Sequence, residues 1–437
     1  MKRVVIVGGG FGGLAVARGL GEKRGPGALE VTLIDERNHH LFQPLLYQVA
    51  MAGLSPAEIS APIRGLLSRY RNTRVLCRRV DSIDLSARRV LTRDASYPYD
   101  FLVLACGSRH SYFGHEEWED HAPGLKTLEQ ATEIRRRVLT AFEDAEAETD
   151  PEQQRALLTF VIVGGGPTGV ELAGAIGEMS RFTLARDFRR IDPKLARVLL
   201  IEAGPRILPA FSASLASRAV RDLESLGVQV WTSSPVTRVG PQAVEVGKER
   251  IETRTTLWAA GVEPSRLNRS LDVDLDRQGR VLVDPDLSLP GHPDVFVLGD
   301  QASVAGRGGE PLPGLAPVAL QQGRYLARSI RAHLRGQVVG AFTYRDKGQM
   351  ATIGRQRAVL ETPGLRLRGR LAWLVWLFVH IYYLVGFKNR LFVVLQWLWA
   401  YVSFRRGARL IISKQWRFYE RETTHAVETR PNPETHD

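Results

Sequence analysis

Two glycine-rich stretches carry the residue types and the spacing that could bind a pyrophosphate. Each follows a short apolar run, Val4–Val7 in the first case and Phe160–Val163 in the second, and each precedes a predicted helix. In this pattern the first glycine permits a tight turn, the second lets a pyrophosphate approach the backbone, and the third lets helix and strand pack closely. The start of the helix adds unpaired N–H groups and the positive end of its dipole. The glycines are Gly8, Gly10 and Gly13 in the first stretch and Gly164, Gly166 and Gly169 in the second.

An acidic residue ends the second predicted strand of each unit. These acids and their strands are Asp35 after Glu30–Ile34 and Glu202 after Arg197–Ile201. A carboxylate at this place can accept a hydrogen bond from a ribose 2′-hydroxyl. One fingerprint alone also fits an ordinary glycine-rich turn, but two fingerprints with an acid each indicate two dinucleotide sites. The 38 positions from Gly164 to Glu202 exceed the usual spacing of roughly 20, and a predicted helical stretch, Arg181–Arg190, accounts for the excess.

The segment after the first acid, Glu36–Gly53, has the clean periodicity of neither a helix nor a strand. The polar residues among its apolar ones include His39, His40, Gln43 and Gln48. It is either a loop around a packed aromatic residue or a segment that runs beneath a cofactor. The second interpretation is favoured because the segment begins directly after a ribose-binding acid.

Further along the chain, the apolar strand within Asp294–Asp300 ends on Gly299 and Asp300. A carboxylate in this place serves as a helix N-cap or as a ligand for a sugar-alcohol chain, and the two roles can coexist. Other predicted strands are Arg74–Arg79, Val80–Leu85, Arg89–Thr92, Phe101–Ala105, Val228–Trp231 and one within Thr256–Gly261; predicted helices are Pro56–Tyr70, Thr127–Ala147 and Pro317–Leu334. This order predicts an α/β fold with two Rossmann-like dinucleotide-binding domains.

The C-terminal part changes character. Leu371–Phe387 and Leu391–Phe404 are apolar, rich in Trp and Tyr, and separated by Lys388-Asn389-Arg390. Runs of 17 and 14 residues are short for a spanning helix, which needs about 20 apolar residues. A monotopic amphipathic helical membrane anchor is favoured, because aromatic residues and flanking cations suit the headgroup boundary. A single span through Leu371–Phe387 and a buried helix hairpin are the alternatives. The flanking basic residues are Arg366, Arg368, Arg370, Arg405, Arg406 and Arg409.

The composition narrows the class of partner. The 437 residues are enough for two or three domains, and the net charge of +12 implies attraction to a polyanion. No nucleic-acid motif is present and the basic residues crowd the C-terminal part, so an anionic lipid surface is favoured over nucleic acid. The two cysteines, Cys77 and Cys106, exclude a disulfide framework and lie on predicted strands, where they look like core residues.

Two dinucleotide sites in one chain suit an enzyme that passes a hydride between two cofactors. The first site, with the later strand ending at Asp300, would hold FAD, and the central site would take a nicotinamide nucleotide. Because a 2′-phosphate would face the Glu202 carboxylate, NADH is expected to be preferred over NADPH. Arg206 lies close enough in the sequence to soften that preference.

The residues that are missing restrict the electron acceptor. No cysteine lies between Asp35 and Arg74, where disulfide reductases carry their redox pair, and two cysteines are too few for an iron–sulfur site. No metal site is expected. The apolar tail then favours a lipid-soluble acceptor, quinone. The remaining alternatives are a sulfide:quinone reductase, a soluble ferredoxin or rubredoxin reductase, and a redox-regulated binding protein that senses NADH.

Longer stretches of the chain resemble the type II NADH dehydrogenases, single-subunit flavoenzymes that oxidise NADH and reduce quinone without pumping protons. The resemblance runs from about Lys2 to Trp416. It is carried by VVIVGGGFGGL, DERNHHLFQPLLYQVA, VIVGGGPTGVELAGAIGE, VFVLGDQA, YRDKGQMATIGR and LFVHIYYLVGFKNRLFVVLQW. The resemblance implies FAD contacts from Gly8, Gly10, Gly13, Asp35, Gly299 and Asp300, and NADH contacts from Gly164, Gly166, Gly169 and Glu202.

The same resemblance implies three residues near the reacting groups. Glu171 matches a family glutamate near the nicotinamide and the quinone that is proposed to handle protons; by itself it would be a first-turn residue stabilised by the helix dipole. Gln321 is the candidate quinone-site residue, although Pro317 replaces the first glutamine of the family's Ala-Gln-x-Ala-x-Gln element. Lys347 matches a basic residue near the quinone headgroup.

The resemblance also implies the organisation and setting of the protein. Residues 1–125 and 276–345 would form the FAD domain, 126–275 the NADH domain and 346–437 the quinone-site and membrane-anchoring region. We expect tightly bound, non-covalent FAD, with NADH and a membrane quinone as substrates. The expected location is the cytoplasmic face of the inner membrane, and the expected assembly is a homodimer that binds no nucleic acid.

Overall fold

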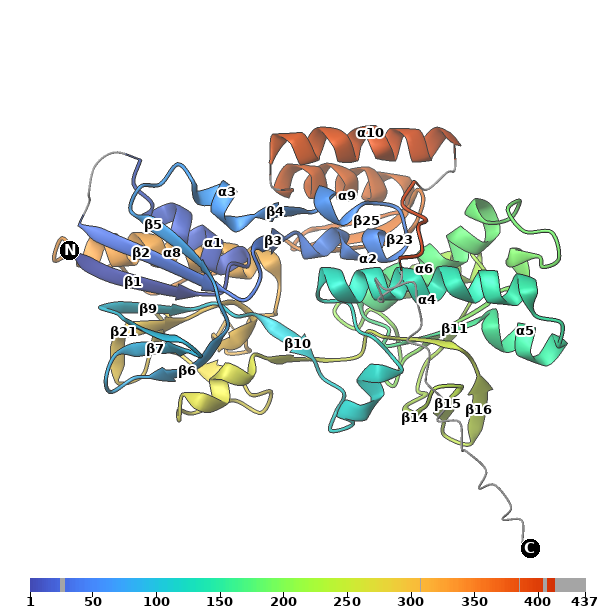
Figure 1. Cartoon of the computed structure of the whole chain (residues 1–437), viewed down its shortest axis with the longest axis horizontal. Coiled ribbons are helices and arrows are strands. Elements are labelled where there is room, and N and C mark those ends of the chain that lie inside the picture. The colour runs from blue at the N-terminus through green and yellow to red at the C-terminus, as the bar shows by residue number, and fades with distance from the viewer. Residues whose placement is uncertain (24–27, 307, 385, 404–406, 413–437) are drawn as a thin grey trace, which may run out of the picture.

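The computed structural model describes residues 1–23, 28–306, 308–384, 386–403 and 407–412. Figure 1 shows two α/β units side by side, with the C-terminal elements lying along one edge of both. The chain passes from the first unit to the second and then returns, so the first unit is built from both the N-terminal part and the residues near 290–335.

The first unit is organised around a six-stranded sheet in the order β20-β21-β9-β1-β2-β5. Its central strand β1 is parallel to both neighbours, with Val4 opposite Val31 on β2 and opposite Phe101 on β9. Helices α1 (Phe11–Leu20) and α8 (Ala316–His333) pack on this sheet, and their buried side chains form one core with it. The strands are β1 (Lys2–Val7), β2 (Leu29–Asp35), β5 (Thr73–Cys77), β9 (Phe101–Leu104), β20 (Ser288–Leu289) and β21 (His292–Val297).

The second unit repeats this plan with four parallel strands in the order β13-β12-β11-β17. All five residues of β11 are buried, as expected for a central parallel strand covered on both faces. The strands are β11 (Thr159–Val163), β12 (Arg197–Ile201), β13 (Val228–Trp231) and β17 (Thr255–Trp258); the helices are α4 (Leu128–Ala147), α5 (Pro151–Leu157), α6 (Pro167–Glu178) and α7 (Ala213–Glu224).

Each unit also carries a three-stranded antiparallel sheet, and a two-stranded ribbon joins the units. In the first unit the sheet is β6 (Val80–Asp84), β7 (Arg89–Thr92) and β8 (Ala95–Pro98); in the second it is β14 (Val236–Val239), β15 (Ala243–Val246) and β16 (Glu249–Glu252). The ribbon pairs β10 (Ser108–His110) with β18 (Val262–Pro264). The short pairs are β3 (His39–Leu41) with β4 (Ser60–Pro62) and β19 (Val281–Leu282) with β22 (Ala302–Ser303).

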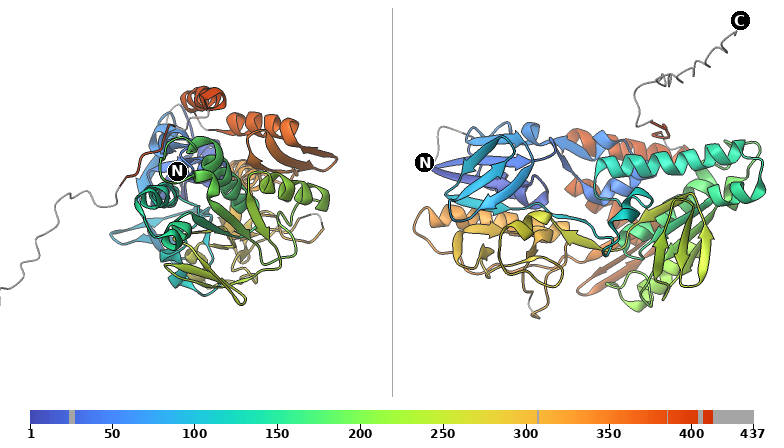
Figure 2. Two further views of the ribbon diagram at one scale, coloured as in Figure 1. Left: turned by 90° about the vertical axis from the view of Figure 1, so that its right-hand side faces the viewer. Right: turned by 60° about the horizontal axis from the view of Figure 1, so that its bottom comes forward.

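The C-terminal elements are a small antiparallel sheet and two helices. Figures 1 and 2 place α10 at the outer edge of the molecule, with α9 between it and the sheet. One hydrophobic core runs from the second unit through this sheet into both helices. The elements are β23 (Gln349–Gly354), β24 (Arg357–Thr362), β25 (Leu365–Arg368), α9 (Gly369–Tyr383) and α10 (Phe387–Ser403).

Several short helical turns complete the described chain. The α-helical ones are α2 (Leu46–Ala50) and α3 (Ile63–Leu67); the 3-10 turns are Gln43–Leu45, Pro56–Glu58, Glu116–Asp120, Pro193–Leu195, Arg266–Ser270 and Gly299–Gln301; the π turn is Met179–Thr183.

The structure corrects three sequence predictions. The helix predicted over Pro56–Tyr70 is wrong, because the capping box of Ser55 and Glu58 starts only one 3-10 turn and Ser60–Pro62 then pairs with β3. The helical stretch predicted over Arg181–Arg190 is also wrong, since the π turn that continues α6 ends at Thr183. Cys77 ends an outer strand and is exposed, so it is not a core residue.

The structure also excludes one of the alternatives for the C-terminal part. Helix α9 ends at Tyr383, so a single span through Leu371–Phe387 is not formed. Among the described residues, no helix has both the length and the hydropathy to cross a membrane. Phe404, Arg405 and Arg406 lie outside the described residues.

Candidate functional site

The first fingerprint forms a cradle at the carboxyl end of β1. Gly8 has a φ of +103°, and a Cβ there would lie 2.3 Å from the carbonyl oxygen of Ala105. A Cβ on Gly13 would lie 1.9 Å from the carbonyl oxygen of Gly8, so the close approach of helix and strand requires glycine at both places. A Cβ on Gly10, the N-cap of α1, would meet no atom within 4 Å. The cradle therefore leaves open space where a pyrophosphate would approach.

The second fingerprint has the same geometry. Gly164 has a φ of +107°, and its Cβ would lie 2.6 Å from the backbone of Ala259. A Cβ on Gly169 would lie 1.8 Å from the carbonyl oxygen of Gly164, while one on Gly166 would meet nothing within 4 Å. The predicted strand–turn–helix is thus confirmed in both units.

Each predicted acid is fixed against its cradle by two backbone N–H groups. Asp35 accepts from Gly9 N at 2.6 Å and from Arg37 N at 2.7 Å. Glu202 accepts in the same way from Gly165 N at 2.6 Å and from Gly204 N at 2.6 Å. Burial raises the pKa of Asp35, and the two N–H groups oppose that shift. Both carboxylates thus lie beside the glycines, in the position from which a dinucleotide ribose is bound.

The later strand β21 closes on the first cradle as predicted. Gly299 N donates to Gln322 Oε1 at 2.7 Å, and Asp300 Oδ2 accepts from Ser108 Oγ at 2.6 Å. Gln301 is fully buried: its Oε1 accepts from Cys106 N at 2.9 Å, and its Nε2 donates to Asn268 at 2.6 Å. This network fixes the position of the Gly299–Asp300 turn.

Sequence reasoning did not find Gln301 and Gln322 as supports of this site. The signal that could have found them is an amide in a buried setting, since such a group must have a hydrogen-bond partner. Gln301 follows the Gly-Asp pair directly, and Gln322 is the buried neighbour of Gln321 on α8.

Glu171 lies on α6, where the C-terminal sheet packs against the second unit. A Cβ on Gly174 would lie 1.8 Å from the carbonyl oxygen of Ile353, so β23 lies directly against the helix backbone. Glu171 accepts a hydrogen bond from the N–H of Thr352 on β23. Burial nevertheless raises the pKa of Glu171 to about 8, so this carboxyl is largely protonated at neutral pH.

Gln321 contacts the segment that precedes β23, and Lys347 belongs to that segment. The Gln321 side chain donates to Arg345 O at 3.0 Å and accepts from Arg345 N at 3.1 Å. Lys347 donates to the Tyr383 hydroxyl at 3.1 Å, with Nζ 5.9 Å from the centre of that ring. The structure thus brings the three predicted residues to one segment, 345–352, which leads from α8 past α9 to α6.

Aromatic side chains connect the first cradle to helices α9 and α10. Near the cradle, His40 Nδ1 lies 3.0 Å from Gly9 O, and burial lowers the pKa of His40 to about 4, so its ring is neutral. Near the helices, the rings of His380 and Trp376 are 4.4 Å apart, and burial lowers the pKa of His380 to about 4. Phe42 lies between these two ends, 6.2 Å from His380 by ring centres.

The segment Glu36–Gly53 packs several of its apolar residues, Phe42 among them, into a hydrophobic core, and its place beneath a cofactor stays a prediction. It begins at the first cradle and ends against the C-terminal helices, where Trp397 Nε1 donates to Gln48 Oε1 at 2.8 Å. Within the described part of the chain, the buried Trp376 Nε1 has no hydrogen-bond partner.

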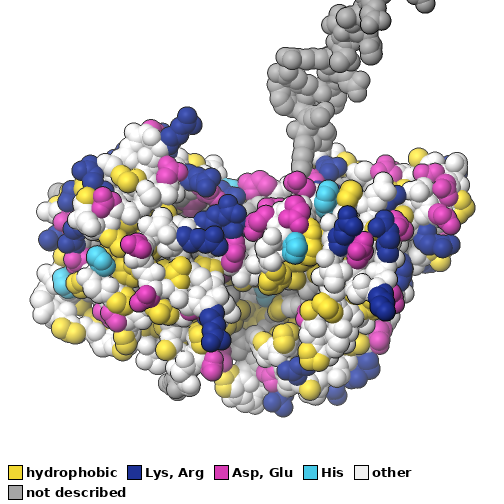
Figure 3. Space-filling model, turned by 90° about the horizontal axis from the view of Figure 1, so that it is seen from below, with side chains coloured by type: hydrophobic (Ala, Val, Ile, Leu, Met, Phe, Trp, Pro, Cys, Tyr) yellow, Lys and Arg dark blue, Asp and Glu magenta, His cyan; other side chains and the backbone are white. Residues whose placement is uncertain are grey.

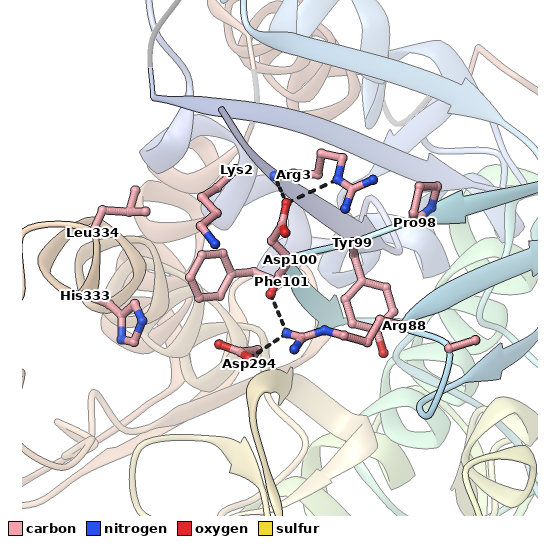
Figure 4. A pocket seen from close by; sticks show the side chains of 11 residues that line it. Lys2, Arg3, Arg88, Pro98, Tyr99, Asp100, Phe101, Asp294, His333 and Leu334 are labelled. Atoms are coloured by element: carbon pink, nitrogen blue, oxygen red, sulfur yellow. Dashed lines mark hydrogen bonds and ion pairs between the residues drawn. The ribbon is translucent and has the colours of Figure 1, made fainter.

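A separate cavity lies at the opposite edge of the first sheet. It measures about 530 Å³ and is spanned by two ion pairs, Arg3 with Asp100 and Arg88 with Asp294 (Figure 4). Its lining includes Lys2 and Phe101 at the amino ends of parallel strands, whereas ligands of open α/β sheets bind beyond the carboxyl ends. This cavity is therefore not part of the candidate site.

The two cysteines are far apart in the first sheet. Cys77 ends β5 and Cys106 follows β9, and β2 and β1 lie between these strands. Three strand spacings amount to about 14 Å, too far for a disulfide. Burial raises the pKa of the Cys106 thiol to about 12, so it is not a reactive thiolate.

Comparison with known proteins agrees with this geometry. The family of pyridine nucleotide-disulphide oxidoreductases matches residues 2–323, and the family described as the NDH2 C-terminal domain matches residues 347–406. The chain is 44% identical to the type II NADH:quinone oxidoreductase Ndh of Mycobacterium tuberculosis, over 94% of this chain and 91% of that one. It is 30% identical to the internal alternative NAD(P)H-ubiquinone oxidoreductase A1 of Arabidopsis thaliana mitochondria, over 93% and 86%.

Solved structures share the fold. NDH2 from Plasmodium falciparum in complex with NADH superposes with a TM-score of 0.86 at 18% identity, covering 94% of this chain and 100% of that chain. The sulfide:quinone oxidoreductase of Aquifex aeolicus reaches 0.70 at 20% identity, covering 89% and 92%. At these identities the likeness concerns the fold alone.

The two cradles, their acids and the match over residues 2–323 define an oxidoreductase of the pyridine nucleotide-disulphide class. That class is built on FAD and a pyridine nucleotide. Within it, the chain belongs to the type II NADH:quinone oxidoreductases, as its similarity to the mycobacterial Ndh and its C-terminal domain show. The resemblance stated from the motifs is confirmed.

Proposed function

We propose that this chain takes a hydride from NADH at the second cradle and delivers two electrons to a membrane quinone through FAD at the first, without pumping protons. The balance is NADH, quinone and one proton to NAD⁺ and quinol. The observation that carries the proposal is the segment 345–352. At one end it contacts Gln321 and includes Lys347, and at the other end it contacts Glu171 on the helix of the second fingerprint.

The first cradle fits FAD on its own geometry. Gly10 faces open space, Asp35 would accept from a ribose, and Asp300 would accept from a sugar-alcohol chain. FAD, when bound, accepts the hydride and passes the two electrons on. Gly8, Gly13 and Gly299 shape the backbone around it, and their positive φ angles or close approaches exclude larger residues.

The second cradle fits NADH. Gly164, Gly166 and Gly169 repeat the phosphate cradle, and Glu202 would accept from the ribose. Arg206 is turned to the carbonyl oxygen of Pro209, to which Nη2 donates at 2.7 Å. This supports a preference for NADH, since a 2′-phosphate would meet a carboxylate and find the nearby guanidinium already engaged.

Three residues are proposed to serve the quinone half-reaction. Glu171, protonated below about pH 8, would supply a proton to the reduced quinone. Lys347 is exposed beside Tyr383 and would bind the quinone headgroup. Gln321 would act at the same headgroup or would hold the backbone of Arg345. Its two hydrogen bonds to Arg345 support the second role.

The C-terminal helices are proposed as a monotopic anchor. The outward stripe of α9 is apolar and exposed, and its residues recur at the 3.6-residue period of one helix face. Exposed apolar residues on α10 extend this surface. Such an area is large for a soluble protein and typical of a membrane interface. The residues are Leu371, Leu374, Phe378 and Tyr382 on α9 and Leu391, Phe392, Val394, Leu395 and Leu398 on α10.

The opposite face of the molecule is different in kind. Seen from below, positive, negative and hydrophobic side chains are mixed over its surface (Figure 3). We infer that α9 and α10 face an anionic lipid surface on the cytoplasmic side of the inner membrane, toward which the net charge of +12 would draw the protein. The homodimer, the absence of nucleic-acid binding and the domain boundaries stay predictions.

The decisive experiment is anaerobic mixing of the FAD-loaded protein first with NADH and then with a short-chain quinone. We expect the flavin absorbance to bleach on the first addition and return on the second. Bleaching without recovery would remove quinone as the acceptor, and no bleaching would remove NADH as the donor.

A further inference from the structure

A partly buried lysine joins the two dinucleotide units beside the first site. Lys126 Nζ donates to Ser108 Oγ at 2.9 Å, and Ser108 Oγ donates to Asp300 Oδ2 at 2.6 Å. Lys126 Nζ is also 3.9 Å from Asp300 Oδ2. The lysine and aspartate side chains are only 21% and 24% exposed, so water screens this charge pair much less than it would on the surface.

The lysine is held in place from three directions. Its backbone N–H donates to Gln130 Oε1 at 2.9 Å, and its carbonyl accepts from Gln43 Nε2 at 3.1 Å. Lys126 belongs to the segment before α4, Ser108 to the ribbon between the units, and Asp300 to the turn after β21. The ammonium group is therefore fixed before any ligand arrives, which is the condition for an effective electrostatic contact.

The imidazole of His110, the titratable ring beside Lys126, adds no positive charge to this site. His110 on the same ribbon is buried, and its pKa is lowered to about 4, first by burial and then by Lys126. Its ring packs on Gly124, where a Cβ would lie 2.0 Å from the ring. The ring is therefore neutral at physiological pH, and the charge beside Asp300 is that of Lys126.

We propose that Lys126 is a positioning residue for the bound flavin, a proposal that rests on the proposed function. It holds the Asp300 carboxylate, through Ser108, so that Asp300 can accept a hydrogen bond from the sugar-alcohol chain of FAD. Reduction of bound FAD by NADH would give NAD⁺ and a product with one more negative charge than oxidised FAD. A fixed cation at this site favours that product over the oxidised form.

The test compares Lys126→Met, Lys126→Arg and Ser108→Ala in the FAD-loaded protein. FAD affinity is measured by release on dilution, and the midpoint potential by equilibration with a reference dye. We expect Lys126→Met to weaken FAD binding about tenfold. If the variant also loses a tenfold preference for reduced over oxidised FAD, the midpoint potential should fall by 29.6 mV, the value for a two-electron couple. Lys126→Arg should retain most of both properties because it keeps the charge.

Controls separate electrostatics from folding and from the overall reaction. Lys248→Met removes a lysine from the exposed turn between β15 and β16 and should change neither quantity. Ser108→Ala should weaken FAD binding with a smaller effect on the potential, since the cation remains. Unchanged FAD affinity and potential in Lys126→Met would overturn the proposal, as would an equal loss in Lys126→Arg. Failure of quinone to reoxidise the wild-type flavin would instead overturn the proposed function and leave this dependence measurable.

Discussion

The two dinucleotide units have nearly the same cradle but different neighbours on their fingerprint helices. In the first unit α1 packs against α8, so closely that a Cβ on Gly323 would lie 2.5 Å from the Gly12 carbonyl oxygen. In the second unit α6 packs against β23, with Gly174 over Ile353. Helix α8 packs on the same sheet as α1, whereas β23 belongs to the C-terminal region.

This difference teaches how one fold can serve two ligands. The glycines and acids make each cradle fit a dinucleotide. The element packed against the fingerprint helix determines which other part of the protein the site contacts. The fingerprint helix of the first site is covered by a helix of its own unit, as suits a resident cofactor. The helix of the second site packs against β23, the strand that follows Lys347, and β23 in turn contacts α9, one of the two helices proposed to meet the membrane.

The largest expected effects come from the third glycine of each cradle. Gly13→Ala and Gly169→Ala both place a methyl group within 2 Å of a carbonyl oxygen. We expect Gly13→Ala to lose FAD and all activity, and Gly169→Ala to keep FAD but lose reduction by NADH by at least 100-fold. Flavin absorbance and stopped-flow bleaching measure the two. Gly65→Ala, where the nearest atom is 4.0 Å away, is the control. Equal loss of FAD in both variants would contradict the division of roles.

Glu171→Gln tests the contact between the second unit and β23. We expect quinone reduction to fall about 100-fold, the low end of the usual range for one acid–base group, with flavin reduction by NADH little changed. In the wild type the carboxyl is protonated below about pH 8 and ionised above it, so quinone reduction should decline as the pH rises through 8. The glutamine variant should lose this decline. A decline that persists in the variant would assign the titration to another group.

The C-terminal surface is tested by placing charges on its exposed stripe. Leu374→Glu combined with Phe378→Glu should reduce binding to anionic vesicles about tenfold or more, because a carboxylate opposes both apolar burial and the lipid charge. Co-sedimentation with vesicles measures it. Val338→Glu, at a side chain 98% exposed on another segment, should have little effect. Undiminished sedimentation of the double variant would place the membrane contact elsewhere.

The smallest effect concerns the choice between NADH and NADPH. Glu202→Gln should lower the kcat/KM for NADH about tenfold and that for NADPH less, because the change removes the charge that opposes a 2′-phosphate. The ratio of the two constants is the measurement. An unchanged ratio would show that the preference arises from another residue.

The sequence predicted the sites better than the elements that surround them. Both cradles and both acids could be found because the turn, the strand and the acid lie within 40 residues and are set by local sterics. The helix predicted over Pro56–Tyr70 failed because strand β4 depends on pairing with β3, which is a tertiary contact. Lys126 and Gln301 could not be found because their partners lie about 20 to 200 positions away.

The shared core of the second unit and the C-terminal helices has a consequence for biogenesis. Ile353, Trp376 and Val393 lie in the same buried cluster as Phe160 and Ile176. During synthesis the middle of the chain therefore cannot complete its core until residues near 393 have left the ribosome, about 135 positions after the last strand of its sheet. The first fingerprint waits as well, because α8 follows it by some 300 positions. Each unit is completed only by residues that are synthesised long after its fingerprint, so a nascent chain released early has no complete unit to fold.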